Sequence, residues 1–215
     1  MPGREVDQPI KLAVLVSGAG RTLQNLLDQI QAGTLPARVS VVIGSRAGLG
    51  GLQKATAAHI PTCAVDRRTF TSVQDFSKQI FALCDEAGVD LVCLAGWLCL
   101  LDVPERYRDR VMNIHPALLP GFGGKGMFGQ HVHETVLRAG MKISGCTVHF
   151  VDNDYDAGPI ILQRVCPVLD DDTPETLAAR VFEEEKIAYL QAIRLFAQGR
   201  LRVESGRVRV DADRK

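Results

Sequence analysis

The alternation of apolar runs and amphipathic stretches in the first half of the chain predicts an α/β fold. Residues 11–17 (KLAVLVS) form a continuous apolar run, typical of a strand buried on both faces. From 22 to 31 apolar residues recur at helical spacing, and Thr22 is the expected N-cap. The same rhythm predicts strands at 38–43, 61–65, 90–95 and 110–114, and helices at 49–58 and 72–87. Strands that alternate with helices indicate a mostly parallel twisted sheet flanked by helices on both faces.

The second half of the chain has a different pattern and predicts a C-terminal antiparallel portion. A glycine-rich segment (PGFGGKGMFG, 120–129) shows neither helical nor strand periodicity. Further strands are expected at 145–152 and 160–168, helices at 131–139 and 174–198, and a terminal hairpin at 201–210. Thr173 is the expected cap of the long helix, with Pro174 as its first residue. At 215 residues the chain fits a single domain, with halves at about 10–110 and 111–200 and a tail at 201–215.

Composition narrows the class of protein. Hydrophobic residues make up 46% of the chain and charged residues 23%, as in an ordinary soluble globular protein. The formal net charge is zero, so nothing favours a nucleic-acid partner. The longest apolar stretch, 89–101, is too short to span a membrane, and the polar segment 1–8 lacks the pattern of a secretion signal. The six cysteines form no C-x-x-C pair, which favours reduced thiols in a cytoplasmic protein over disulfides or a metal site.

Asn113 and His115 are the leading candidates for chemistry. They lie two residues apart at the end of an expected strand, so both side chains point to one face and Ile114 to the other. Two extended residues span roughly 6.6 Å, a separation that lets an amide and an imidazole flank one small reacting centre. Pro116 cannot donate to a ladder, so strand pairing is expected to stop just after His115. The alternative is a polar strand end that satisfies only the loop backbone.

A glycine turn follows the first strand. In Ser17-Gly18-Ala19-Gly20-Arg21-Thr22 the backbone N–H groups at the start of a helix favour an anion such as a phosphate monoester. A dinucleotide fits less well, because Leu23 stands where G-x-G-x-x-G has its third glycine and no acid follows the second strand. Arg46 could bind the 2′-phosphate of NADP, so an NADP-dependent enzyme is an alternative. A tight turn without any ligand is the other interpretation.

Carboxylates gather at 152–156 (DNDYD), between two expected strands. Asp156 is expected to address His115, to raise the pKa of its imidazole and to keep it protonated at neutral pH as a general acid. A calcium loop is disfavoured because the glycine and the distal glutamate of an EF-hand are missing. A zinc site at His131 and His133 is disfavoured for want of a third ligand. His149 is interpreted as either a satisfied core residue or a support for the site, and 123–126 as either a cover over bound substrate or a flexible surface crossing.

In their order along the chain, these motifs closely resemble the phosphoribosylglycinamide formyltransferase family of purine biosynthesis. The resemblance runs from about Lys11 to Leu201 and is carried by the whole ordered set rather than by any single motif. Its segments are VLVSGAGRTLQNLL at 14–27, LAGWLCLL at 94–101, MNIHPALLP at 112–120, SGCTVHFVDNDYDAGPIILQ at 144–163 and RVFEEEK at 180–186.

The resemblance implies a Rossmann-like formyltransferase fold and transfer of a formyl group from 10-formyltetrahydrofolate to the amine of glycinamide ribonucleotide. It implies direct attack by the amine, without a metal, in a monomer or homodimer. Asn113 then holds the developing oxyanion, His115 donates a proton and Asp156 supports His115. The implied substrate phosphate and ribose contacts are Gly20, Arg21, Thr22, Phe182, Glu183, Glu184 and Glu185. The implied folate contacts are Leu98, Cys99, Leu100, Leu101, Asn113, Asp152, Asn153, Asp154, Tyr155 and Asp156.

The chain departs from the family pattern at two places. Leu98-Cys99 stand where many members have Met-Arg, and Val73 aligns near the basic residue that meets the folate glutamate tail, so Arg67 or Arg68 is expected to substitute. Three rival functions remain. A formyltransferase acting on methionyl-tRNA is expected to carry an additional C-terminal domain, and a formyltetrahydrofolate hydrolase an N-terminal regulatory one. A non-catalytic folate- or nucleotide-binding protein is the third.

Overall fold

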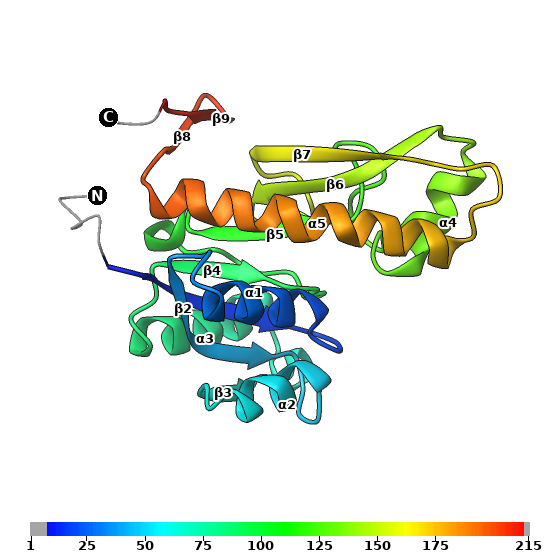
Figure 1. Ribbon diagram of the computed structural model, residues 1–215. Coiled ribbons are helices and arrows are strands. Elements are labelled where there is room, and N and C mark those ends of the chain that lie inside the picture. The colour runs from blue at the N-terminus through cyan, green and yellow to red at the C-terminus, as the bar shows by residue number, and fades with distance from the viewer. Residues whose placement is uncertain (1–7, 213–215) are drawn as a thin grey trace. The chain divides into compact units, whose positions relative to one another are not determined.

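The first apolar run forms a central strand of a parallel sheet. In the computed structural model, which describes residues 8–212, β1 (Ile10–Val16) pairs in parallel with β2 (Ala37–Gly44) and with β4 (Leu91–Leu94) (Figure 1). The short strand β3 (Thr62–Ala64) pairs with the free side of β2. Six of the seven residues of β1 are buried, as expected of a strand covered on both faces. The expectations for the segment 1–7 and for 213–215 lie outside the described residues.

These strands belong to the first of two compact units, which comprises 1–99, 193–201 and 210–215 as far as they are described. Its helices are α1 (Arg21–Gln31), α2 (Gly50–Ala57) and α3 (Val73–Glu86), with a 3₁₀ turn at Arg67–Thr69. The strands lie in the order β3-β2-β1-β4, so the chain adds β2 and β3 on one side of β1 and then crosses back to add β4 on its other side. Right-handed crossovers therefore place α1 and α2 on one face of these strands and α3 on the other.

The expected cap of α1 was wrong. Gly20 is the N-cap, in the left-handed region at φ 71°, and no side chain caps the helix. A β-carbon on Gly20 would lie 2.6 Å from the Cα of Gly51, so glycine alone fits this close approach. By contrast, Ser72 caps α3 by accepting a hydrogen bond from the Asp75 amide at 3.0 Å.

The second unit comprises 100–192 and 202–209 and is built on antiparallel strands. β6 (Ile143–Phe150) lies between β5 (Val111–His115) and β7 (Ile160–Pro167) and is antiparallel to both. β5 ends at His115, as the following proline predicted. In the β5–β6 register Asn113 stands opposite His149, and His115 stands opposite Thr147.

Two helices, a 3₁₀ turn at Glu105–Tyr107 and a hairpin complete the described chain. α4 covers Gln130–Arg138, and α5 covers Pro174–Ala197. As expected, Thr173 caps α5, since its hydroxyl accepts from the Thr176 amide at 3.3 Å. The buried Tyr189 hydroxyl of α5 donates to the Met112 carbonyl of β5 at 3.0 Å. β8 (Leu201–Glu204) and β9 (Arg207–Val210) form the expected terminal hairpin.

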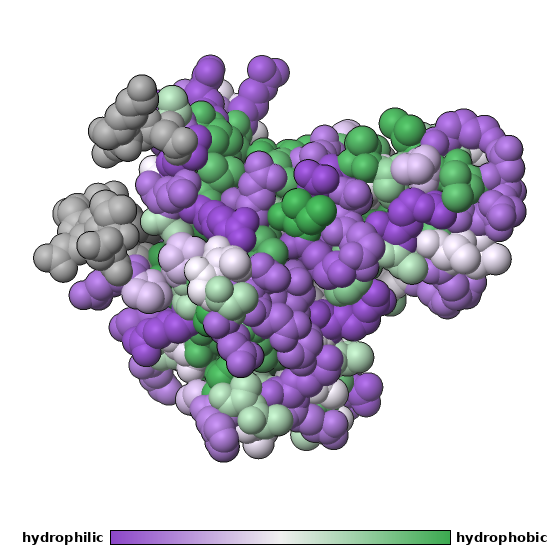
Figure 2. Space-filling view, viewed as in Figure 1, coloured by the Kyte–Doolittle hydropathy of each residue, from purple (hydrophilic) through white to green (hydrophobic). Residues whose placement is uncertain are grey.

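The predicted fold class is confirmed: a parallel α/β sheet flanked by helices is followed by a C-terminal antiparallel portion. Between Gln8 and Ala212 no helix has both the length and the apolar character needed to cross a membrane. In the space-filling view of Figure 2, hydrophilic residues cover most of the visible surface, and apolar residues lie between them in small groups.

Candidate active site

Asn113, His115 and Asp156 meet in the second unit. The Nδ1 atom of His115 lies 3.5 Å from one Asp156 carboxylate oxygen, Oδ2. The Nδ2 atom of Asn113 lies 3.4 Å from the other, Oδ1. The strand period of two turns both β5 side chains toward the loop that follows β6. One carboxylate therefore addresses the amide and the imidazole at the same time.

The position of Asp156 follows from the backbone around it. Its φ is 55°, in the left-handed region that Asp tolerates better than most residues. Two residues later, a β-carbon on Gly158 would lie 1.9 Å from the Phe150 carbonyl oxygen. The loop after β6 therefore folds back tightly against the end of its own strand, which brings Asp156 to β5.

The electrostatics of His115 differ from the expectation. The residue is buried, with 3% of its surface exposed. Burial lowers the pKa of the imidazole, while the Asp156 charge and the Phe122 carbonyl raise it, and the net shift is downward. The expectation that Asp156 keeps His115 protonated at neutral pH is therefore wrong for this structure. The carboxylate acts in the expected direction, but desolvation of the ring outweighs it.

Asp156 remains ionised despite its partial burial. Burial raises the pKa of its carboxyl group, but the neighbouring His149 ring, the charge of His115 and the Gly124 amide lower it, and the net shift is downward. The carboxylate is thus available as a negative partner for an imidazolium at His115.

The glycine-rich loop lies directly on these two side chains. The carbonyl oxygen of Phe122 accepts a hydrogen bond from His115 Nε2 at 2.8 Å. The Gly124 amide donates to Asp156 Oδ2 at 3.0 Å. Gly123 has no space for a side chain, because a β-carbon there would lie 2.4 Å from Leu119 Cδ2. Of the two interpretations of 123–126, the contacts support a cover over the site rather than a free surface crossing.

His149 is the site residue whose role the sequence left open. It is 2% exposed, and its Nε2 lies 3.1 Å from Asn113 Nδ2 and 3.6 Å from Asp156 Oδ1. Its Nδ1 lies 2.8 Å from the Phe150 carbonyl oxygen. His149 is recognised as a site residue from the pairing of β5 with β6, in which it stands opposite Asn113.

The expected phosphate turn belongs to the first unit. Gly20 caps α1, and the first intrahelical bond of that helix runs from the Gln24 amide to the Gly20 carbonyl at 3.0 Å. The N-terminus of a helix in general presents backbone N–H groups to an anion, so the start of α1 fits the expected phosphate site.

The expected ribose and amine contacts lie along α5, and two of them form ion pairs within the chain. Glu184 pairs with Arg164 of β7 at 2.6 Å, and Glu183 pairs with Lys186. The Lys186 ammonium also lies over the Phe182 ring, 5.8 Å from its centroid.

Burial and the nearby charge of Glu185 raise the pKa of the Cys146 thiol to about 12, so that thiol stays protonated.

The expected folate contacts are divided between the two units. Leu98, 45% exposed, and Cys99 belong to the first unit, while Leu100 and Leu101 belong to the second. In the loop after β6, Asp152 accepts a hydrogen bond from the Asp154 amide at 3.1 Å, and Asn153 accepts one from the Val103 amide at 2.9 Å. Tyr155 is 38% exposed.

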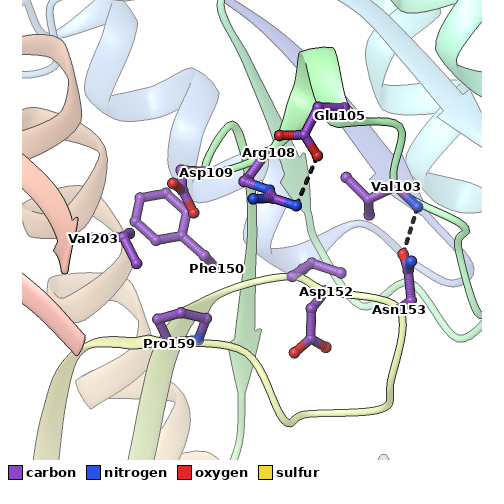
Figure 3. A pocket seen from close by; sticks show the side chains of 10 residues that line it. Val103, Glu105, Arg108, Asp109, Phe150, Asp152, Asn153, Pro159 and Val203 are labelled. Atoms are coloured by element: carbon purple, nitrogen blue, oxygen red, sulfur yellow. Dashed lines mark hydrogen bonds and ion pairs between the residues drawn. The ribbon is translucent and has the colours of Figure 1, made fainter. Parts of the chain in front are cut away.

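A pocket of about 440 Å³ lies beside the same loop in the second unit (Figure 3). Asp152 and Asn153 line it, but the three converging side chains do not. Arg108 and Glu105 form an ion pair of 2.7 Å at its side. Its other lining residues are Val103, Asp109, Phe150, Val151, Pro159 and Val203. No local pattern predicts this pocket, because its walls come from separated segments of the chain, at 103–109, 150–159 and 203.

Arg68, the expected contact for the folate tail, is held by a neighbouring acid. Asp66 accepts from Arg68 Nε at 3.0 Å and from Nη2 at 2.6 Å. Hydrogen bonding to Arg68 lowers the pKa of the Asp66 carboxyl group to about 2, so the pair stays charged on both sides. Arg67 instead donates to the Phe70 carbonyl at 2.8 Å. In the described part of the chain, no three His, Cys, Asp or Glu side chains group in a way that fits a metal ion.

Comparison with known proteins identifies the family. The family model described as formyl transferase matches residues 10–193. The chain is 39% identical to the trifunctional purine biosynthetic protein adenosine-3 of Gallus gallus, over 96% of this chain but only 20% of that protein. It thus spans about a fifth of the length of that trifunctional relative.

Two relatives match over nearly their full length. The phosphoribosylglycinamide formyltransferase of Haemophilus influenzae is 34% identical, over 94% of this chain and 93% of that protein. The crystal structure of glycinamide ribonucleotide transformylase 1 from Symbiobacterium toebii superposes with a TM-score of 0.88 at 42% identity, covering 98% of this chain and 97% of that one. The chain therefore belongs to the formyl transferase family, among the phosphoribosylglycinamide formyltransferases.

Proposed function

We propose that the chain transfers the formyl group of 10-formyltetrahydrofolate to the amine of N1-(5-phosphoribosyl)glycinamide. The observation that carries this proposal is the meeting of Asn113 and His115 on Asp156. The reaction needs a donor for an oxyanion and a group that moves a proton between two nitrogens. Family membership supports the choice of the two substrates, and the geometry supports the assignment of these two groups.

The uncharged amine attacks the formyl carbon, and the electrons of the carbonyl double bond move to its oxygen. An N–H of Asn113 stabilises that oxyanion, a contribution of about 3–4 kcal/mol for donors of this kind. When the intermediate collapses, the bond from carbon to the folate nitrogen breaks. The amine nitrogen loses one proton and the folate nitrogen gains one, so the proton count balances.

His115 carries that proton. Because its pKa is lowered, the imidazole is neutral at neutral pH and accepts the proton from the attacking amine. Asp156, 3.5 Å from Nδ1, stabilises the imidazolium formed in this way. His115 then donates the proton to the leaving nitrogen. In this structure Nε2 donates to the Phe122 carbonyl and therefore carries the ring proton. Before Nε2 can accept a proton from the amine, the loop at 121–129 must release it and the ring proton must move to Nδ1, which faces Asp156.

The remaining contacts position the substrates. The amides at the start of α1 bind the substrate phosphate, with Gly20, Arg21 and Thr22 as contacts. Phe182 to Glu185 face the ribose and glycinamide, and Leu98–Leu101 with Asp152–Asp156 line the pterin pocket. Arg67 or Arg68 meets the glutamate tail of the folate. We place the protein in the cytoplasm, in keeping with its six free cysteines. We expect a monomer or a homodimer.

One assay separates this function from its rivals. Purified chain is incubated with 10-formyltetrahydrofolate, with and without glycinamide ribonucleotide, and loss of the formyl donor is followed. We expect loss that depends on the amine. Loss without the amine identifies a hydrolase. No loss under either condition identifies a non-catalytic binding protein, or a formyltransferase that needs methionyl-tRNA as its acceptor.

A further inference from the structure

The orientation of the Asn113 side chain decides whether it stabilises an oxyanion. An amide group presents either an oxygen or an NH₂ group, and the two have nearly the same shape. Only the NH₂ group donates hydrogen bonds, so a flipped amide would turn its carbonyl oxygen toward the negative charge. Something in the protein must hold Asn113 in the donating orientation.

His149 has the contacts to do so. A backbone carbonyl only accepts hydrogen bonds, so the 2.8 Å contact with the Phe150 oxygen requires the proton of His149 to sit on Nδ1. In the neutral ring, Nε2 then carries a lone pair. That lone pair accepts a hydrogen bond from Asn113 Nδ2 at 3.1 Å. A flipped amide would place its oxygen against the lone pair, an unfavourable contact of two acceptors.

The second N–H of Asn113 is more weakly held. It points to Asp156 Oδ1 at 3.4 Å, beyond the usual range of a good N–H···O hydrogen bond. This N–H can therefore leave Asp156 and donate to a substrate oxygen instead, because only a weak hydrogen bond is lost. The first N–H keeps the amide in place while the second acts.

We infer that His149 is a positioning residue, which fixes the amide of Asn113 with its nitrogen toward the reacting centre. This inference rests on the proposed function. The Phe150 carbonyl sets the tautomer of His149, the tautomer sets the acceptor at Nε2, and the acceptor sets the orientation of Asn113.

Two isosteric variants separate the two ring nitrogens. His149→Gln places an acceptor near the position of Nε2, whereas His149→Asn keeps a donor toward Phe150 but has no acceptor in reach of Asn113. We expect the Gln variant to keep kcat within about 5-fold. We expect the Asn variant to lose about 10- to 100-fold in kcat, with KM for both substrates nearly unchanged. Equal losses in both variants, or wild-type turnover in the Asn variant, would overturn the inference.

A measurement without turnover keeps the inference separate from the proposed function. Long-range ¹H–¹⁵N spectra of wild-type protein at neutral pH should show His149 protonated at Nδ1 and bare at Nε2. That tautomer in a protein without transferase activity refutes the proposed function but not the contact. The opposite tautomer in an active enzyme overturns the inference alone.

Discussion

At the scale of single residues, Asp156 connects the parts of the site. Its Oδ2 atom meets His115 and the Gly124 amide, and its Oδ1 atom meets Asn113 and His149. A carboxylate has room for about four such partners. The loop, the imidazoles and the amide are therefore all held by one group, and a change at any of them alters the balance at the others.

The first prediction concerns His115. Replacing it by alanine removes the group that moves the proton, so kcat should fall by at least about 100-fold while binding of the substrate phosphate stays nearly unchanged. The measurement is steady-state kinetics, with calorimetric titration of glycinamide ribonucleotide. His131→Ala is the control, because His131 is an exposed histidine on α4 of the same unit. Wild-type turnover of the His115 variant would remove this residue from the mechanism.

At the scale of elements, β6 positions the end of β5 through one hydroxyl group. The buried Thr147 Oγ1 donates to the Ala117 carbonyl at 2.7 Å and accepts from the Leu119 amide at 3.0 Å. Gln163 of β7 donates to the same oxygen and to the Leu119 carbonyl, each at 2.9 Å. Two strands, β6 and β7, thereby hold the segment that leads from His115 into the glycine-rich loop.

The second prediction tests this network. Thr147→Val keeps the shape of the side chain but leaves a buried amide and the Ala117 carbonyl without their partner. The free energy of unfolding should fall by about 1–3 kcal/mol, and kcat should fall because the loop over His115 shifts. Urea denaturation and steady-state kinetics measure the two effects. Thr147→Ser, which keeps the hydroxyl, should lose less of both, and equal losses in the two variants would show that the methyl group matters rather than the network.

At the scale of the whole molecule, buried histidines link stability to pH. Burial lowers the pKa of His115 and of His133 in the folded chain. As the pH falls, these two side chains therefore become protonated in the unfolded chain first and in the folded chain only at a lower pH. The unfolded chain, with histidine pKa values near about 6.5, binds more protons in that range. Folding stability therefore rises with pH through this window and falls as the pH drops below about 6.5.

The third prediction follows from that sign. The midpoint of urea denaturation should decrease from pH 7.5 to pH 5.5, and less steeply in His133→Gln, which has no imidazole at that position. A midpoint that increases on acidification would contradict the lowered pKa values. At still lower pH the lowered pKa of Asp156 acts in the same direction, because its carboxylate must be protonated on unfolding.

The sequence predicted the elements and the meeting of Asn113 with His115, since both depend on local periodicity and on Pro116. Other features depend on contacts that no local pattern encodes. The cap of α1 follows from the close approach of Gly20 to Gly51, which are distant in sequence. The pKa of His115 depends on burial beneath a loop without periodicity, which reversed the expected shift. The role of His149 becomes visible only once the register of β5 and β6 is known.

The atom that covers His115 belongs to the main chain. The Phe122 carbonyl oxygen is present whatever side chain occupies position 122, so saturation mutagenesis there leaves the covering group in place. Selection for a faster or slower opening of the site must instead act on the torsion angles of the neighbouring glycines, of which Gly124 has φ 95°. Variants that restrict those torsions, rather than ones that change side-chain chemistry, are the means of tuning access to the His115 imidazole.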